Sequence, residues 1–189
     1  MVSFINMQNF ISVDSTLNSL VITSNLEKKK TIRVLNYSKS DNFSKDFQKI
    51  LHKNKINFLN AELLLVNLGP GSYAGIRNIL SSLKVFSIIF GIKLVGFTNK
   101  SIGKVFCINR KLKNLVIISI NNKFLNLYNY KDLKIEEFQG ILQTKKVVSN
   151  FKYNDIFKKN LVSFEYNASD IEFLIQNKLF IKKNLSPKY

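Results

Sequence analysis

The chain has 189 residues, of which 29 are lysine or arginine and 12 are aspartate or glutamate, for a formal net charge of +17. With 46% hydrophobic residues it can bury a sizeable core, in one domain or in two small lobes. Its single cysteine excludes an internal disulfide, and one cysteine with one histidine excludes an ordinary zinc site. The sequence opens with no signal-peptide pattern and has no apolar run long enough to cross a bilayer, so we expect a cytoplasmic protein without a membrane partner.

The positive charge has two explanations. A basic surface suggests binding of nucleic acid or another polyanion. However, only Arg33, Arg77 and Arg110 are arginines, whereas proteins that read nucleic acids favour arginine for bidentate contacts. A surface rich in lysine is also what an AT-rich genome produces. The excess of lysine favours genome composition as the main cause of the charge, and a basic RNA-binding protein is kept as the alternative.

The predicted elements begin with three short strands in a meander, at residues 9–16, 17–23 and 31–37. Ser40 and Asp41 mark the start of a helix that carries Phe43 and Phe47 on one face. An apolar run at 63–68 predicts a strand buried on both faces. Glycines follow it, and apolar residues then recur at helical spacing to Phe90. The unit is a strand, a tight turn and a helix.

After the central helix the pattern predicts a strand at 91–96 and a brief helix at 98–107. The polar, basic run at 109–114 separates two apolar regions, so we place a boundary between lobes there. Beyond it we expect a hairpin from 115–120 and 124–130, a strand at 133–138 and a helix at 168–181.

The glycine-rich turn at 69–75 has two interpretations. Unpaired N–H groups at a helix start attract phosphate, and Gly69-x-Gly71-x-x-Ala74 fits the loose dinucleotide fingerprint. That fingerprint needs a carboxylate about twenty residues later for the ribose, but after Glu62 the next is Asp132. A Walker A lysine is absent, and Pro70 has no N–H to donate. A structural turn is favoured, and we expect no cofactor.

The same turn carries a family resemblance. Residues 69–77 read Gly-Pro-Gly-Ser-Tyr-Ala-Gly-Ile-Arg, and residues 91–97 read Gly-Ile-Lys-Leu-Val-Gly-Phe. This is similar to the signature of the TsaB (YeaZ) family, where Gly-Pro-Gly-Ser-Phe-Thr-Gly-Leu-Arg, an alanine-rich helix and Gly-Ile-Pro-Leu-Val-Gly-Val follow one another. The resemblance implies a bacterial partner protein of tRNA threonylcarbamoyladenosine biosynthesis. It also implies an α/β, actin-like (ASKHA, RNase H-like) fold of two small lobes with mixed sheets, which we assign to residues 1–108 and 109–189.

The resemblance places Asp14 where the first strand of the family ends in Asp-Thr-Ser. In phosphotransferase relatives this aspartate helps to hold a metal-bound nucleotide, but here no second carboxylate accompanies it in the core. A turn-stabilising aspartate is therefore favoured. His52 is the only histidine, so the His-x-x-x-His metal site of the related catalytic subunit, TsaD, cannot form. We expect no metal and no catalytic residue. We assign structural roles at the turn to Asp14, Gly69, Pro70, Gly71, Ser72, Gly75 and Arg77.

Without catalysis, surface recognition must carry the function. The second half of the central helix is apolar nearly all round, which requires either the chain's own second lobe or a partner to cover it. The resemblance favours a partner, because TsaB-like proteins pair through the first two helices, with themselves or with TsaD. The predicted contact residues are Phe43, Phe47, Ile76, Leu80, Leu83 and Lys84.

These inferences combine into one hypothesis: a non-catalytic subunit that binds and supports a TsaD-like catalytic subunit. In that complex a TsaE-like ATPase would be a further partner, and tRNA would be met only through the assembly. The alternatives are a stand-alone basic RNA-binding protein and an actin-like kinase that needs Mg-ATP.

Overall fold

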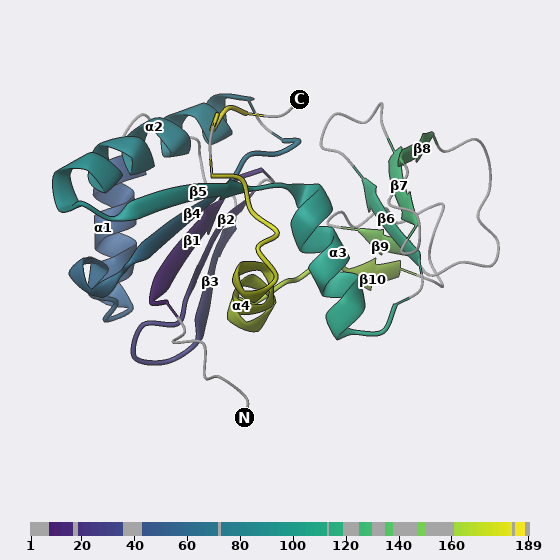
Figure 1. Cartoon of the computed structure of the whole chain (residues 1–189), viewed down its shortest axis with the longest axis horizontal. Helices are drawn as coiled ribbons and strands as arrows, with labels where there is room; N and C mark the ends of the chain where they lie inside the picture. The colour runs from purple at the N-terminus through teal and green to yellow at the C-terminus, as the bar shows by residue number, and fades with distance from the viewer. Residues whose placement is uncertain are drawn as a thin grey trace.

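The computed structural model describes residues 8–16, 19–35, 43–71, 73–112, 114–118, 125–129, 135–137, 147–149, 161–182 and 184–187. Its centre is a five-stranded sheet in the order β3-β2-β1-β4-β5 (Figure 1). The strands are β1 (Phe10–Asp14), β2 (Ser19–Ser24), β3 (Lys30–Leu35), β4 (Leu63–Asn67) and β5 (Lys93–Phe97). The first three are antiparallel neighbours, whereas β4 and β5 run parallel to β1. The predicted meander and both later strands are confirmed.

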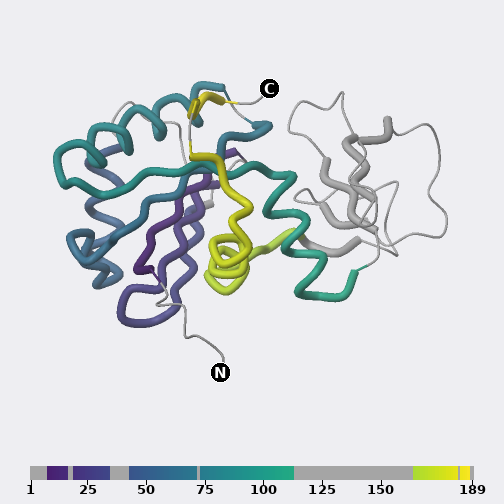
Figure 2. The backbone as a smooth tube through the Cα atoms, viewed as in Figure 1, coloured from purple at the N-terminus to yellow at the C-terminus, as the bar shows by residue number. Residues whose placement is uncertain are grey.

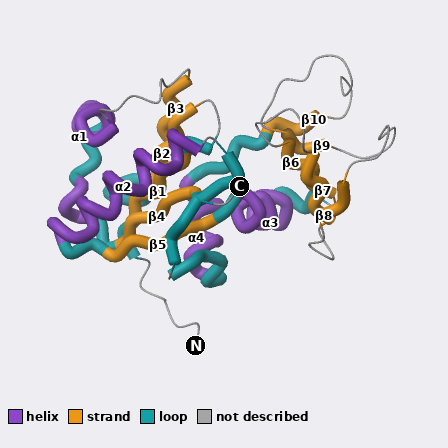
Figure 3. Tube along the Cα trace, turned by 90° about the horizontal axis from the view of Figure 1, so that it is seen from above, coloured by secondary structure: helices purple, strands orange, loops and turns teal. Residues whose placement is uncertain are grey.

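Helices cover both faces of this sheet. The helices are α1 (Phe43–Lys53), α2 (Tyr73–Phe90), α3 (Asn99–Asn109) and α4 (Ala168–Gln176), with a short 3-10 turn, η1 (Phe58–Asn60), after α1. Side chains of α1, η1 and α2 share one buried core with β1, β2 and β4, and side chains of α3 and α4 share the other. Seen from above, the sheet lies between these two helix layers (Figure 3). The predicted strand, turn and helix around residues 63–90 are confirmed.

Local sequence explains where the later helices start. Thr98 precedes α3 and exchanges hydrogen bonds with Ser101 in a capping box. Asn167 does the same with Asp170 at the start of α4. Gly91, with φ +64°, follows the last residue of α2 in the left-handed conformation that commonly ends a helix.

The C-terminal segment packs on the first sheet. Tyr166, Ile171 and Leu174 are buried in the same core as Phe97 of β5 and Phe106 of α3. Figure 2 follows the chain from α4 back across β5 towards α2, where Ile181 forms an antiparallel bridge with Gly96. The predicted helix at 168–181 ends earlier in the structure, at Gln176. The predicted lobe 109–189 includes Tyr166, Ile171 and Leu174, which pack in this core.

Between α3 and α4 the described residues form two small sheets. Antiparallel β6 (Asn114–Ile118), β7 (Leu125–Asn129) and β8 (Ile135–Glu137) form one sheet, and parallel β9 (Val147–Ser149) and β10 (Leu161–Ser163) form the other. The predicted hairpin corresponds to β6 and β7, and its turn residues Asn121 and Asn122 lie outside the described residues. Among the described helices, none is long and apolar enough to cross a membrane.

Candidate functional site: a filled polar centre and an exposed apolar helix face

A buried polar network lies at the carboxyl ends of β1 and β4, the place where α/β sheets bind ligands. Asp14, at the end of β1, is 1% exposed. Its Oδ1 accepts a hydrogen bond from the Thr16 backbone N–H at 2.7 Å. Its Oδ2 accepts two, from Asn67 Nδ2 at 2.9 Å and from the Tyr166 hydroxyl at 2.7 Å. Both oxygens of this carboxylate are therefore engaged by the chain itself.

Asn67 and Asn99 extend the network from Asp14 to the glycine-rich turn. Asn67 Nδ2 also donates to Asn99 Oδ1 at 2.6 Å, and Asn67 Oδ1 accepts from the Gly69 N–H at 3.0 Å. Asn99, at the start of α3, donates its side-chain amide to the Pro70 carbonyl at 2.6 Å and its backbone N–H to the Gly69 carbonyl at 2.9 Å. Buried polar groups must find partners inside the protein, and these side chains supply them.

The turn is held close to the end of β1. Gly69 has φ +107°, and the Gly69–Pro70 peptide bond is cis. A Cβ atom on Gly71 would lie 2.6 Å from the Cα, Cβ and carbonyl oxygen of Thr16, so only glycine fits there. Because the Gly69 N–H is already donated and Pro70 has none, neither is available to a phosphate group.

Tyr166 closes this centre from the opposite end of the chain. Its side chain is 1% exposed, and burial first, then the neighbouring Asp14 carboxylate, raises the pKa of its hydroxyl well above its ordinary value. Arg33 donates to the Tyr166 carbonyl at 2.6 Å, which fixes the segment before α4. The hydroxyl therefore stays protonated and donates to Asp14.

The other residues predicted at the turn have different positions. Gly75 is buried in the first turn of α2, whereas Arg77 is exposed and donates to the Tyr73 hydroxyl at 3.3 Å. Ser72 lies outside the described residues. No three histidine, cysteine or carboxylate side chains gather in a possible metal site within the part of the chain that the structure describes.

The predicted contact residues of α1 and α2 need a correction. Five of them have exposed fractions of 5% or less and pack in the chain's own core: Phe43, Phe47, Ile76, Leu80 and Leu83. The apolar faces of α1 and α2 are turned towards the sheet and towards each other, so they are not surfaces for a partner. Lys84 is exposed, and its Nζ lies 3.4 Å from the Leu185 carbonyl. Ser82 contributes to packing within the chain, since its hydroxyl lies 3.1 Å from that of Ser44 on α1.

The surface of α2 is instead apolar near its C-terminal end. Five side chains form what we call the α2 apolar patch, with their exposed fractions: Leu59 (67%), Val85 (51%), Ile88 (81%), Ile89 (65%) and Phe90 (44%). Four belong to the last turns of α2 and Leu59 to η1. Exposed apolar residues are ordinary when scattered, but contiguous ones mark an interaction surface.

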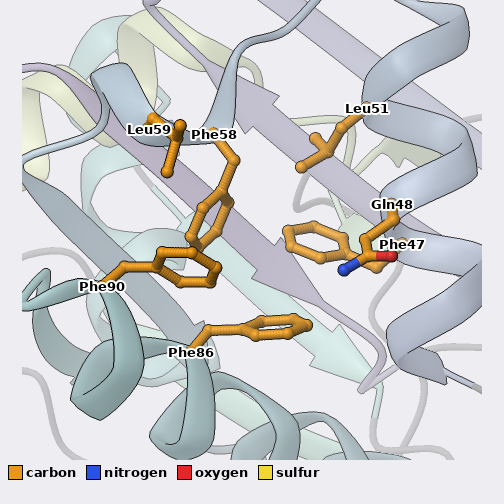
Figure 4. Close-up of a pocket in the computed structure, with 7 residues that line it drawn as sticks. All are labelled: Phe47, Gln48, Leu51, Phe58, Leu59, Phe86 and Phe90. Carbon is orange, nitrogen blue, oxygen red and sulfur yellow. The ribbon is translucent and has the colours of Figure 1, made fainter.

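A pocket of about 250 Å³ lies beside this patch, between α1, η1 and α2 (Figure 4). It is lined by Phe47, Gln48, Leu51, Phe58, Leu59, Phe86 and Phe90. The ring of Phe58 meets those of Phe86 and Phe90 edge-on, with centroids 5.6 and 5.4 Å apart. Gln48 is its one polar lining side chain. The site is thus a preformed apolar recess.

Sequence reasoning missed three members of the polar network: Asn67, Asn99 and Tyr166. The first two carried a signal, because each is a polar residue directly at or after the carboxyl end of an apolar strand. Tyr166 lies 152 residues from Asp14, and no local pattern connects them.

A mixed sheet that begins with an antiparallel meander, continues with parallel strands and has helices on both faces defines an α/β protein of the actin-like (ASKHA, RNase H-like) class. Solved structures agree. YeaZ from Pseudomonas aeruginosa is similar at a TM-score of 0.65 and 9% identity, over 97% of this chain and 100% of that chain. A second structure from the same organism, described as an uncharacterized protein with similarity to peptidase YEAZ, gives 0.64 at 9% identity, over 97% and 99%.

The chain therefore has a YeaZ-like fold. No protein-family model and no curated protein sequence matches it.

Proposed function

We propose that this chain is a non-catalytic subunit of the tRNA threonylcarbamoyladenosine synthesis complex that binds and supports a TsaD-like catalytic subunit. The proposal is supported by one combination of features: the polar network around Asp14 is hydrogen-bonded within the chain, and apolar side chains of α2 are exposed. At the carboxyl ends of β1 and β4 the chain's own donors engage both oxygens of Asp14, while the α2 apolar patch is open to a partner.

The filled centre supports a structural role for Asp14. A carboxylate that holds a metal-bound nucleotide needs a free oxygen directed at the ligand, and usually further carboxylates beside it. Here the Tyr166 hydroxyl and the Asn67 amide both donate to Oδ2 of Asp14, and the Thr16 N–H donates to Oδ1. Calorimetry with Mg-ATP tests this part of the proposal: we expect no heat of binding, and a saturable signal would favour the kinase alternative.

The partner proposal is tested by size-exclusion chromatography of the purified chain mixed with its cognate TsaD-like protein. We expect one earlier-eluting peak at micromolar concentration, and two separate peaks would contradict the proposal. Ile88→Asp is the matching variant, because this side chain is 81% exposed and a carboxylate there leaves the core intact. Leu80, at 5% exposure, is unsuitable since its replacement by Asp would unfold the chain.

One observation favours a second function, a stand-alone basic RNA-binding protein: the net charge of +17. That function predicts binding of RNA by the chain alone, with affinity falling steeply as salt rises. A fluorescence titration with unmodified tRNA at two salt concentrations separates the two, because the partner proposal predicts only weak binding of tRNA by the chain alone.

A further inference from the structure

The C-terminal segment of the chain covers the outer edge of β5. We call residues 181, 182 and 184–187 the C-terminal strap. We propose that this edge is a peptide-binding site that the strap occupies from within the same chain, and that the strap must leave before a partner segment of similar sequence can enter. The inference goes beyond the proposed function, because it concerns the edge of the sheet and not the α2 apolar patch.

The strap is bonded to β5 as an added strand would be. Ile181 forms an antiparallel bridge with Gly96, in which the Ile181 N–H donates to the Gly96 carbonyl at 2.6 Å and the Gly96 N–H donates to the Ile181 carbonyl at 2.9 Å. β5 is the last strand in the order of its sheet, and Figure 3 shows the loop that follows α4 running alongside it. Edge strands bind peptides in this way, through main-chain hydrogen bonds.

The part of the edge that can bind a segment is short. Alternate residues of a strand direct their N–H and C=O groups to the same side, so Leu94 faces outward as Gly96 does. Side chains of the chain already bond the groups at the two ends: the Ile92 carbonyl accepts a hydroxyl at 2.6 Å, and the Thr98 N–H donates to a hydroxyl at 2.9 Å. A bound segment therefore pairs with Leu94 and Gly96.

The side chains of the strap show which sequences fit. Ile181 and Leu185 are partly buried and pack against the core that includes side chains of α1 and α2. A Cβ atom at Gly96 would lie 2.4 Å from Leu68 Cδ1 and 3.0 Å from Leu185 Cδ2, so glycine makes room for the strap. Asn184 has φ +53°, which asparagine adopts more readily than most residues. The fitting segment is thus isoleucine, two variable residues, asparagine and leucine.

The strap can leave without unfolding the rest of the chain. Ile181 and Leu185 both keep part of their side chains exposed, and the Lys84 Nζ lies 3.4 Å from the Leu185 carbonyl at the surface. The preceding segment is anchored more firmly, because Tyr166 is 1% exposed and donates to Asp14. Segments with few buried apolar contacts open locally at a lower free energy than the whole domain.

A synthetic peptide with the sequence of residues 179–187 tests the inference with the full-length chain. Its affinity is measured by fluorescence anisotropy for the wild type and for Leu185→Asp, which weakens the chain's own strap. We expect at least about tenfold tighter binding to Leu185→Asp, because apparent affinity follows the fraction of chains whose site is open. Ser186→Asp makes a similar change of charge at an exposed position and should bind as the wild type does. A peptide with proline in place of Ile181 lacks the N–H that bonds Gly96 and should not bind.

Native-state proteolysis gives a second measurement that needs no peptide. Lys182 is exposed, and trypsin can cleave after it once the strap has left β5. We expect cleavage there in the folded wild type, at a rate that Leu185→Asp raises at least about fivefold and Ser186→Asp leaves unchanged.

Four results would overturn the inference. These are equal affinity of the peptide for the wild type and Leu185→Asp, equal binding of the proline peptide, no binding at millimolar concentration to a Leu185→Asp chain that is folded by circular dichroism, and cleavage after Lys182 that depends on urea as steeply as global unfolding does. Failure of the proposed function is a separate result: the TsaD-like protein would not co-elute although the peptide binds.

Discussion

The hydrogen bond between Tyr166 and Asp14 allows the structural role of the polar centre to be measured. Asp14 accepts three hydrogen bonds in a site that is 1% exposed. In Asp14→Asn one oxygen becomes an NH₂ group, and whichever way the amide is turned at least one buried donor loses its acceptor. We expect this variant to lose about 2–4 kcal/mol of the free energy of unfolding, and Tyr166→Phe about 1.5–3 kcal/mol. Domains of this kind have about 5–15 kcal/mol in total.

The two substitutions should not be additive, because they remove the same hydrogen bond. We expect the double variant to be more stable than the sum of the single losses implies, by about 1–2 kcal/mol, in urea titrations followed by circular dichroism. Tyr73→Phe is the matched control, since this tyrosine is 53% exposed, and should change stability by less than about 0.5 kcal/mol. Additive losses, or an Asp14→Asn variant as stable as the wild type, would refute the structural assignment of Asp14.

Three further predictions concern stability. Burial raises the pKa of the Cys107 thiol from 9.0 to about 11. The unfolded chain therefore releases this proton at lower pH than the folded chain, and the free energy of unfolding should fall by up to about 2 kcal/mol between pH 9 and pH 11. Cys107→Ala should lack that fall in parallel urea titrations. Arg110 donates two hydrogen bonds, of 2.9 and 3.1 Å, to the carboxylate of the buried Asp170. Arg110→Ala should therefore lower the free energy of unfolding by about 2–4 kcal/mol in the same urea titrations, and a loss below about 0.5 kcal/mol would contradict this. Gly71→Ala should cost about 1–3 kcal/mol, because the new methyl group overlaps the Thr16 backbone; an unchanged midpoint would show that the turn relaxes freely.

The sequence predicted the first sheet because its signals are local. An apolar run bounded by glycines, and apolar residues at helical spacing, each specify one element within about twenty residues. Helical spacing also identified Phe47 and Leu83 as the apolar faces of α1 and α2. It could not tell whether a core or a partner covers those faces. The structure places both residues at 0% exposure. The apolar side chains of α2 that stay exposed, such as Ile88, lie outside the face that packs on the core.

The polar centre was only half predictable. The missing carboxylates predicted a structural role for Asp14 and the glycine-rich turn, and glycine at position 71 allows the tight approach of the turn to Thr16. Tyr166, however, comes from the segment before α4, which the sequence analysis placed in a second lobe. Its contact with Asp14 depends on the chain returning to the first sheet, and such long-range packing leaves no periodic trace in the sequence.

We propose that this chain acts through the α2 apolar patch and that its polar centre serves the fold. The most direct measurement compares the affinities of wild type, Asp14→Asn and Ile88→Asp for the TsaD-like protein, at a temperature where all three are folded by circular dichroism. We predict that wild type and Asp14→Asn bind alike, whereas Ile88→Asp binds at least about a hundredfold more weakly, as for a buried interface hot spot. Full binding by Ile88→Asp, or loss of binding by a folded Asp14→Asn variant, would contradict it.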